Sequence, residues 1–230
     1  MICDDIDTIV RNIKTAAEKS GRNLKDIKLV CVTKGRGVEE IKKAISCGVT
    51  DIGENRVQEA VLKYRQMASA SAAVKWHMVG HLQTNKAKDA VRIFDLIHSV
   101  DSLKLAQAIN KEAARANKVQ DILLEVNTSG EEAKFGARPA ELIELAQKII
   151  TLDNLRVLGL MTMAPVVKNK EEARTYFKKL RELMEDVNNF LVLMPNFRLR
   201  ALSMGMSQDY EVAVEEGATM VRIGTAIFEG

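Results

Sequence analysis

The sequence predicts a single α/β domain over residues 1–230, folded as a (β/α)8 barrel of the TIM type with an extra helix at its N-terminus. Short β-branched apolar runs alternate with longer stretches of helical period, a pattern typical of a parallel sheet. Eight such runs occupy about 200 residues, which favours a closed barrel over an open sheet. No GxGxxG motif follows the first run, so nothing supports the dinucleotide-binding form of the open sheet.

The elements follow from apolar periodicity. Ile6, Ile9, Val10 and Ile13 repeat with helical spacing, and Ser20-Gly21 is a typical helix end. The predicted strands span residues 27–33, 49–53, 75–80, 95–100, 121–127, 155–161, 197–203 and 218–224. Between them, helices are expected to begin near Val38, Asn55, Thr84, Ser102, Pro139, Glu171 and Ser207.

Composition excludes several classes of function. The formal net charge is only +3, basic residues are scattered, and aromatic residues make up 4%, so we expect no nucleic-acid partner. No apolar run of about 18 residues occurs, so we expect no membrane span. Cys3, Cys31 and Cys47 have no CxxC spacing, and the N-terminus is acidic. We therefore expect reduced thiols in a cytoplasmic protein.

Two glycine-containing segments follow the last two predicted strands. They are SMGMS at 203–207 and VRIGT at 221–225. Gly205 and Gly224 allow backbone N–H groups to approach an anion closely, and Ser203, Ser207 and Thr225 add hydroxyl groups. Each segment alone also fits an ordinary tight turn. Together, at the positions where barrels of this kind bind phosphate, they predict a phosphate site.

Lys34 stands at the end of the first strand, on the same rim of the barrel. Apolar neighbours would partly desolvate its amine and favour the neutral form, which can attack an aldehyde. The alternative is a solvent-facing lysine that only borders the core. Combined with a phosphate site, Lys34 predicts a phosphorylated aldehyde as ligand, and pyridoxal 5′-phosphate (PLP) is the obvious one.

Arg222 lies inside the last apolar strand, so its partner must lie within the barrel or at its mouth. Arginine is a known partner of the PLP pyridine nitrogen, and a permanent guanidinium charge would oppose protonation of that nitrogen. The cofactor would then be a weak electron sink. The alternative is a structural arginine paired with an acid.

Several stretches now resemble a known family, the pyridoxal phosphate homeostasis proteins, whose barrel is related to the N-terminal domain of alanine racemase. The stretches are VTK (32–34), DIGENRVQE (51–59), WHMVGHLQTNK (76–86), HSVDS (98–102), LEVNTSGEEAKFG (124–136), GLMTMAP (159–165) and residues 202–230. The resemblance implies PLP bound as an internal aldimine on Lys34, with Arg222 facing the pyridine nitrogen. It also implies phosphate contacts from Ser203, Gly205, Gly224 and Thr225, and ring neighbours in Asn55 and Met161. The segment GRG after Lys34 departs from the commoner family pattern, which puts the shape of that loop in doubt.

The resemblance further implies a protein that carries and buffers PLP and regulates intracellular vitamin B6 and amino-acid homeostasis, without efficient turnover. Its partners would be PLP and PLP-dependent apoenzymes. Racemisation needs acid/base groups on both faces of the substrate carbon. Alanine racemases supply one as a tyrosine from a second domain of the partner subunit. We expect no such domain here, and Tyr64, Tyr176 and Tyr210 fall in predicted helices. We therefore expect no catalytic residues and a monomer.

Three alternatives stay open at this point. One is a PLP-dependent racemase or lyase of low activity. Another is a barrel that binds a different phosphorylated metabolite, with Lys34 as an ion-pair partner. Lys134 could cover the site or accept PLP transiently, or be a solvated loop lysine. A metal site is not expected, because His77 and His81 lie on a strand and its loop and no third ligand cluster accompanies them.

Overall fold

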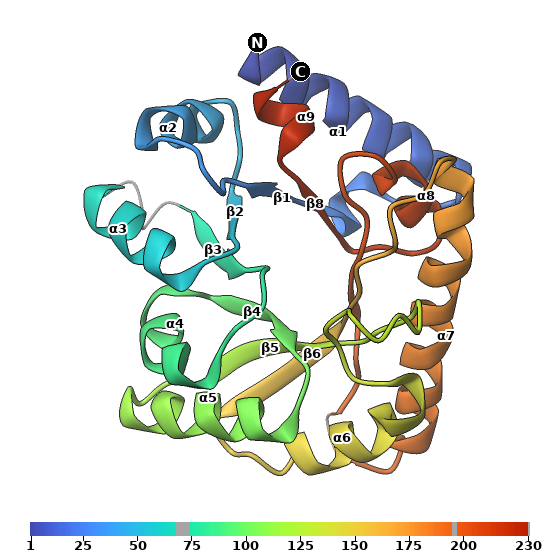
Figure 1. Ribbon diagram of the computed structural model, residues 1–230. Coiled ribbons are helices and arrows are strands. Elements are labelled where there is room, and N and C mark those ends of the chain that lie inside the picture. The colour runs from blue at the N-terminus through green and yellow to red at the C-terminus, as the bar shows by residue number, and fades with distance from the viewer. Residues whose placement is uncertain (68–73, 195–196, 230) are drawn as a thin grey trace.

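In the computed structural model, which describes residues 1–67, 74–194 and 197–229, parallel strands follow one another around a closed barrel in chain order. β8 pairs with β1 and closes the ring (Figure 1). The strands are β1 (Lys28–Val32), β2 (Asp51–Glu54), β3 (Lys75–Met78), β4 (Leu96–Val100), β5 (Gln120–Glu125), β6 (Leu155–Met161), β7 (Ala201–Ser203) and β8 (Met220–Ile223). The predicted fold class is confirmed.

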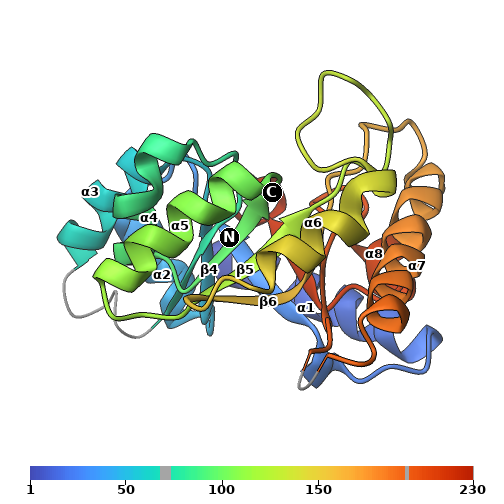
Figure 2. The same cartoon turned by 90° about the horizontal axis from the view of Figure 1, so that it is seen from below.

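Helices surround the barrel, as Figures 1 and 2 show. The α-helices are α1 (Ile2–Lys19), α2 (Val38–Ser46), α3 (Val57–Met67), α4 (Ala87–Ile93), α5 (Leu103–Arg115), α6 (Leu142–Ile149), α7 (Arg174–Phe190), α8 (Tyr210–Glu215) and α9 (Thr225–Phe228). Short 3-10 helices are η1 (Leu24–Asp26), η3 (Thr84–Lys86), η4 (Pro139–Glu141) and η5 (Lys170–Ala173). The extra N-terminal helix α1 packs along α8 and α9.

β7 is the element that departs most from expectation. Its predicted start was residue 197, but the strand begins at Ala201. The backbone N–H of Leu199 donates to the side chain of Asn188 in α7, and the Leu199 carbonyl accepts from the same amide. The main chain at Leu199 is therefore satisfied by a helix side chain instead of by a neighbouring strand.

The core has two parts because strand side chains alternate between the two faces of the sheet. The larger part lies between the strands and the helices, where Trp76, Phe94 and Phe177 are fully buried. The smaller part lies inside the barrel and consists of Val30, Val79, Leu96, Leu123, Met161, Ala201 and Met220. Polar residues share the barrel interior with these apolar ones, and they form the site described below.

The cysteines differ from the expectation of three reduced thiols. Cys3 at the start of α1 and Cys47 at the end of α2 form a disulfide, with their Cα atoms 5.4 Å apart. The two helices pack against each other, which places the residues together although they are 44 positions apart in the chain. Cys31 is a free, buried thiol. No helix in the described ranges is both long and apolar enough to span a bilayer.

Candidate ligand site at the barrel mouth

Lys34 lies in the turn that follows β1, at the carboxyl end of the barrel strands. Its side chain is exposed, and within the described residues it forms no hydrogen bond or ion pair. The expectation that the strand itself would desolvate this lysine is therefore not met, because the turn carries the side chain clear of the apolar neighbours. The amine is nonetheless free to react with a ligand at the mouth.

Buried polar contacts hold the main chain on either side of Lys34. The Nζ atom of Lys63 in α3 donates to the carbonyl oxygen of Thr33 over 2.6 Å. The same amine bonds Glu54 at 2.7 Å and Glu59 at 2.6 Å. These bonds tie the end of β1 to the neighbouring β2 and α3.

The other side of the turn is held through Glu59. Its Oε1 atom accepts from the backbone N–H of Gly35 over 2.7 Å. Burial raises the pKa of Glu54, while hydrogen bonds from Lys63 and Thr33 oppose the rise. Sequence reasoning missed this network, because a lysine in an amphipathic helix is expected on the solvated face.

The loops after β7 and β8 meet at the part of the mouth beside β1, because β8 pairs with β1. The Ser207 hydroxyl oxygen accepts from the backbone N–H of Ala226 over 3.4 Å. Gly205 has φ +91°, and the N–H groups of Gly205 and Ser207 have no partner among the described residues. The Met206 N–H is already bonded to Asp209. Among the described residues, the geometry thus leaves free backbone donors at Gly205 and Ser207, where a phosphate was expected.

Ser203 is positioned differently from the prediction that its hydroxyl contacts phosphate. The side chain is fully buried inside the barrel, where its oxygen lies 2.8 Å from His98 Nδ1 and accepts from Arg222 at 2.6 Å. Both partners lie inside the barrel, so His98 and Arg222 hold the hydroxyl there. β7 presents alternate residues to the interior, and Ser203 is one of them.

Arg222 occupies the interior of β8, as expected. One terminal nitrogen donates to the Ser203 hydroxyl and the other to the Thr162 carbonyl oxygen over 2.9 Å. No carboxylate of the described residues forms an ion pair with it, which disfavours the alternative of an acid-paired structural arginine. Burial lowers the pKa of Arg222 to about 10, with Glu125 and Asp209 opposing, so the guanidinium is charged at neutral pH.

The remaining predicted residues lie on the same rim or just beneath it. Met161 is buried in the barrel interior at the end of β6. Asn55 directly follows β2 and is half-buried. Gly224 directly follows β8, and a side chain there would bring its Cβ within 2.9 Å of the Val32 carbonyl oxygen. Thr225 is exposed at the first residue of α9.

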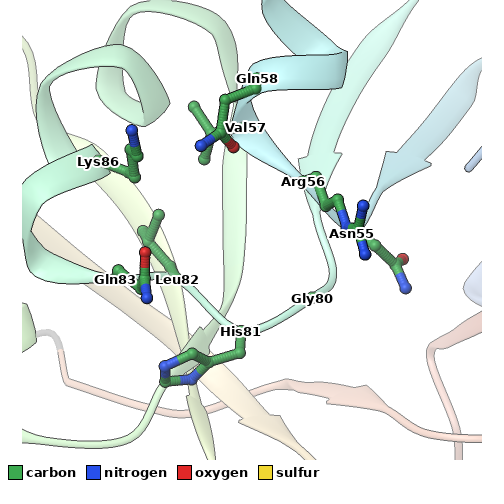
Figure 3. Close-up of a pocket in the computed structure, with 9 residues that line it drawn as sticks. All are labelled: Asn55, Arg56, Val57, Gln58, Gly80, His81, Leu82, Gln83 and Lys86. Atoms are coloured by element: carbon green, nitrogen blue, oxygen red, sulfur yellow. The ribbon is translucent and has the colours of Figure 1, made fainter.

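A cavity of about 620 Å³ opens beside Asn55, between the loops after β2 and β3. Figure 3 shows Asn55 and Arg56 on one side and Lys86 on the other. The lining includes Arg56, His81 and Lys86 and contains no carboxylate. This side of the mouth therefore favours anionic groups.

Two of the three histidines are buried. His77 bonds Asp51 through Nε2 and His98 through Nδ1, each at 2.9 Å. His81 instead stacks on Phe135 of the loop after β5, with ring centroids 3.8 Å apart. In Figure 2 this loop projects from the same end of the barrel as the loop after β6. No group of three potential metal ligands occurs in the described part of the chain.

Lys134 lies in the same projecting loop as Phe135. Its amine forms an ion pair with Glu131 at 2.9 Å. The contact is between residues three apart, so it reflects the local loop conformation.

The residues at the mouth suit a phosphorylated aldehyde. Among the residues that the structure describes, one end of the barrel carries an amine and backbone N–H groups without partners, together with a buried guanidinium that has unused N–H hydrogens. The amine matches an aldehyde, the backbone donors match a phosphate, and the guanidinium matches a ring nitrogen.

Comparison with known proteins agrees with this arrangement. The family "Alanine racemase, N-terminal domain" matches residues 5–230. The pyridoxal phosphate homeostasis protein of Aquifex aeolicus is 44% identical over 227 residues, covering 98% of this chain and 96% of its own. PipY of Synechococcus elongatus, solved with PLP bound, is 32% identical with a TM-score of 0.86, covering 99% of this chain and 100% of its own.

An alanine racemase of Clostridium difficile shares the fold at a TM-score of 0.75 and 18% identity. It covers 98% of this chain, whereas this chain covers 56% of the racemase. The identity of the homeostasis-protein relatives and their near-complete coverage, together with the shared barrel, place the sequence among them. The chain belongs to the pyridoxal phosphate homeostasis proteins, a family built on the alanine racemase N-terminal domain fold.

Proposed function

We propose that the protein binds PLP reversibly on Lys34 and thereby carries and buffers it, contributing to intracellular vitamin B6 and amino-acid homeostasis. The observation that carries the proposal is the free amine of Lys34 on the same rim as the donors of Gly205 and Ser207 and above Arg222. The names of the relatives and the PLP bound to PipY support it.

The chemistry needs only the amine and the ligand. The neutral Lys34 amine adds to the aldehyde carbon, one water leaves, and a C=N bond joins protein and ligand. Water reverses the reaction, and the amine of an acceptor enzyme can replace Lys34 directly. A covalent but exchangeable bond therefore suits a carrier.

The phosphate end would be bound by main-chain donors of the loops after β7 and β8. We propose contacts from Gly205, Ser207, Gly224 and Thr225, with Ser203 contributing no hydroxyl. Asn55 and Met161 stay our proposed neighbours of the ring. Lys134 lies on a loop at the same rim and could cover the bound ligand.

We propose that binding does not lead to efficient turnover. A charged Arg222 can only donate to the pyridine nitrogen, which keeps that nitrogen unprotonated and the ring a weak electron sink. The tyrosines lie in helices, and the Tyr210 hydroxyl accepts from Asn12. None of them stands at a strand end where alanine racemase would need an acid/base group.

One observation favours the alternative of a weak racemase or lyase. Glu125 ends β5 with a buried carboxyl oxygen that has no partner among the described residues. Burial and Asp101 raise its pKa to about 7, with Arg222 opposing, which suits an acid/base group. Exchange of an amino-acid α-hydrogen with deuterated water, lost in Glu125→Gln, would support this alternative. No exchange across a panel of amino acids would eliminate it.

The cellular setting is part of the proposal. We propose a single-domain, cytoplasmic monomer that receives PLP and passes it to PLP-dependent apoenzymes. Transfer of PLP to an apoenzyme would be measured as recovery of that enzyme's activity. Sedimentation of the purified protein would test the monomer.

The central test is trapping of the Schiff base. PLP is added to the wild-type protein, Lys34→Ala and Lys134→Ala, and each sample is examined for a visible absorption band with and without borohydride. We expect the band in the wild type and Lys134→Ala only, with a reduced adduct mapped to Lys34. An adduct elsewhere, or no band in the wild type, would reject the proposal in favour of another phosphorylated ligand.

A further inference from the structure

A continuous chain of polar side chains crosses the interior of the barrel. The Oδ1 atom of Asp51 lies 2.9 Å from His77 Nε2, and His77 Nδ1 lies 2.9 Å from His98 Nε2. His98 Nδ1 lies 2.8 Å from the Ser203 hydroxyl oxygen, which accepts from Arg222 at 2.6 Å. All five side chains are buried, and they come from β2, β3, β4, β7 and β8.

With both imidazoles neutral, the direction of every hydrogen bond in this chain follows from its end at Asp51. That carboxylate only accepts, so His77 keeps its hydrogen on Nε2 and His98 Nδ1 is left as an acceptor. The Ser203 hydroxyl therefore accepts from Arg222 and donates its own hydrogen to His98 Nδ1. His98 then carries its hydrogen on Nε2 and donates to His77 Nδ1. His77 likewise carries its hydrogen on Nε2 and donates to the carboxylate of Asp51.

In this arrangement each donor along the hydrogen-bond chain faces an acceptor, and both imidazoles are neutral. Burial, together with the positive charge of Arg222, holds the pKa of His98 well below its usual range. Burial opposes ionisation of Asp51, but hydrogen bonds from His77 and Thr50 lower its pKa to about 2. The chain therefore has a fixed polarity, with a carboxylate at one end and a guanidinium at the other.

The binding chemistry proposed above uses neither histidine. Polar groups are costly to bury, and an apolar interior of similar shape would be as stable or more so. The chain also leads to the one side chain that would face the pyridine nitrogen. Its effect on Arg222 is geometric, because Ser203 and Thr162 are the two hydrogen-bond partners of the guanidinium among the described residues.

We propose that Asp51, His77 and His98 are positioning residues that orient Ser203 and, through it, the guanidinium of Arg222 toward the pyridine nitrogen of PLP. This rests on the proposed PLP function. With His98 in place, Ser203 has its hydrogen drawn away from Arg222 and presents a lone pair to it. Without His98, the hydroxyl rotates freely and that anchor is weakened.

The first test needs no PLP. Nitrogen NMR of the ligand-free protein reports which nitrogen of each imidazole carries hydrogen. We expect His77 and His98 both to be neutral with hydrogen on Nε2. The opposite tautomer on either ring, or a charged ring at neutral pH, would overturn the directed chain whatever PLP does.

The second test measures coupling in the PLP-bound protein. We expect His98→Leu to weaken PLP binding about tenfold, the change that corresponds to about 1.4 kcal/mol. We also expect it to shift the absorption band. In an Arg222→Leu background, the same change should alter neither quantity further, because the positioned group is gone.

Controls separate positioning from general damage. Gln120→Leu replaces another fully buried polar side chain, which bonds the main-chain oxygens of Asp95 and Asp121 and takes no part in the hydrogen-bond chain. It should leave the absorption band and the PLP affinity unchanged. Should His98→Leu not fold, Ser203→Ala tests the same anchor. The positioning role would be overturned if the folded His98→Leu or Ser203→Ala variant had the PLP affinity and spectrum of the wild type. It would also be overturned if the substitution had the same effect with Arg222 and in the Arg222→Leu background. Absence of a Lys34-dependent band in the wild type would instead reject the proposed function itself.

Discussion

The ammonium nitrogen of Lys63 lies 2.6 Å from the carbonyl oxygen of Thr33, the residue immediately before Lys34. One lysine is buried and holds the turn, while the other is exposed and free. The buried lysine also bonds Glu54, whose side chain is fully buried. The reactive amine thus stands on a main chain that a second lysine holds in place.

Lys63→Met is expected to destabilise the fold by about 3 to 5 kcal/mol, because it leaves the buried Glu54 carboxyl without its charged partner. Urea unfolding measures the loss. Lys42→Met is the matched control, since Lys42 pairs with Glu39 on the surface at 2.8 Å. That change should cost less than about 1 kcal/mol. Equal unfolding midpoints for the two variants would contradict the role given to Lys63.

Gly205→Ala should be more damaging than a glycine replacement in an open loop. An added Cβ would lie 2.5 Å from the Cβ of Ala213, at a φ of +91°. Overpacking of this kind costs about 1 to 3 kcal/mol, and the backbone conformation adds about 1 kcal/mol. Gly130→Ala is the control, because Gly130 has φ +77° with nothing within 4 Å. Thermal unfolding that shows the same loss for both would refute the packing argument.

Glu125 should make stability fall as pH rises. Its pKa is raised from 4.5 to about 7 in the folded protein, chiefly by burial. The folded state therefore keeps a proton that the unfolded chain has released, and its contribution disappears as pH rises from about 4.5 to about 7. The loss is at most about 3 kcal/mol. Denaturant unfolding at about pH 5 and about pH 8 measures the effect: the free energy of unfolding of Glu125→Gln should change less between the two pH values than that of the wild type. Parallel pH profiles would disprove the assignment.

The Cys3–Cys47 disulfide closes a loop with a sequence separation of 44. Chain entropy predicts a contribution of about 4 kcal/mol to stability for a loop of this length. Cys3→Ser, or addition of reductant to the wild type, should lower the melting temperature, while reductant should not affect Cys3→Ser. Thiol titration of the unreduced, denatured wild type should find Cys31 alone. Three reactive thiols would show that the bond does not form.

Much of the fold was open to prediction from sequence. The alternation of β-branched runs with helical periods is a local property, and it identified every strand of the barrel, with a clear error only at the start of β7. That error arose because Asn188, in the preceding helix, satisfies the backbone of Leu199. Lys34 and Arg222 were singled out because a charged residue is unusual in or directly after an apolar strand, and Gly205 because its loop follows the seventh strand, where such barrels bind phosphate.

Other features depend on contacts between segments far apart in the chain. The sequence by itself determined the barrel, the position of Lys34 after the first strand and that of Arg222 within the last one, because hydrophobic period and residue type are local properties of the sequence. Only the tertiary structure decided that Lys63 is buried, that Ser203 faces His98 and not the mouth, and that Cys3 meets Cys47. Each of these depends on which way a side chain points when strands and helices pack, and no single segment of sequence specifies that direction.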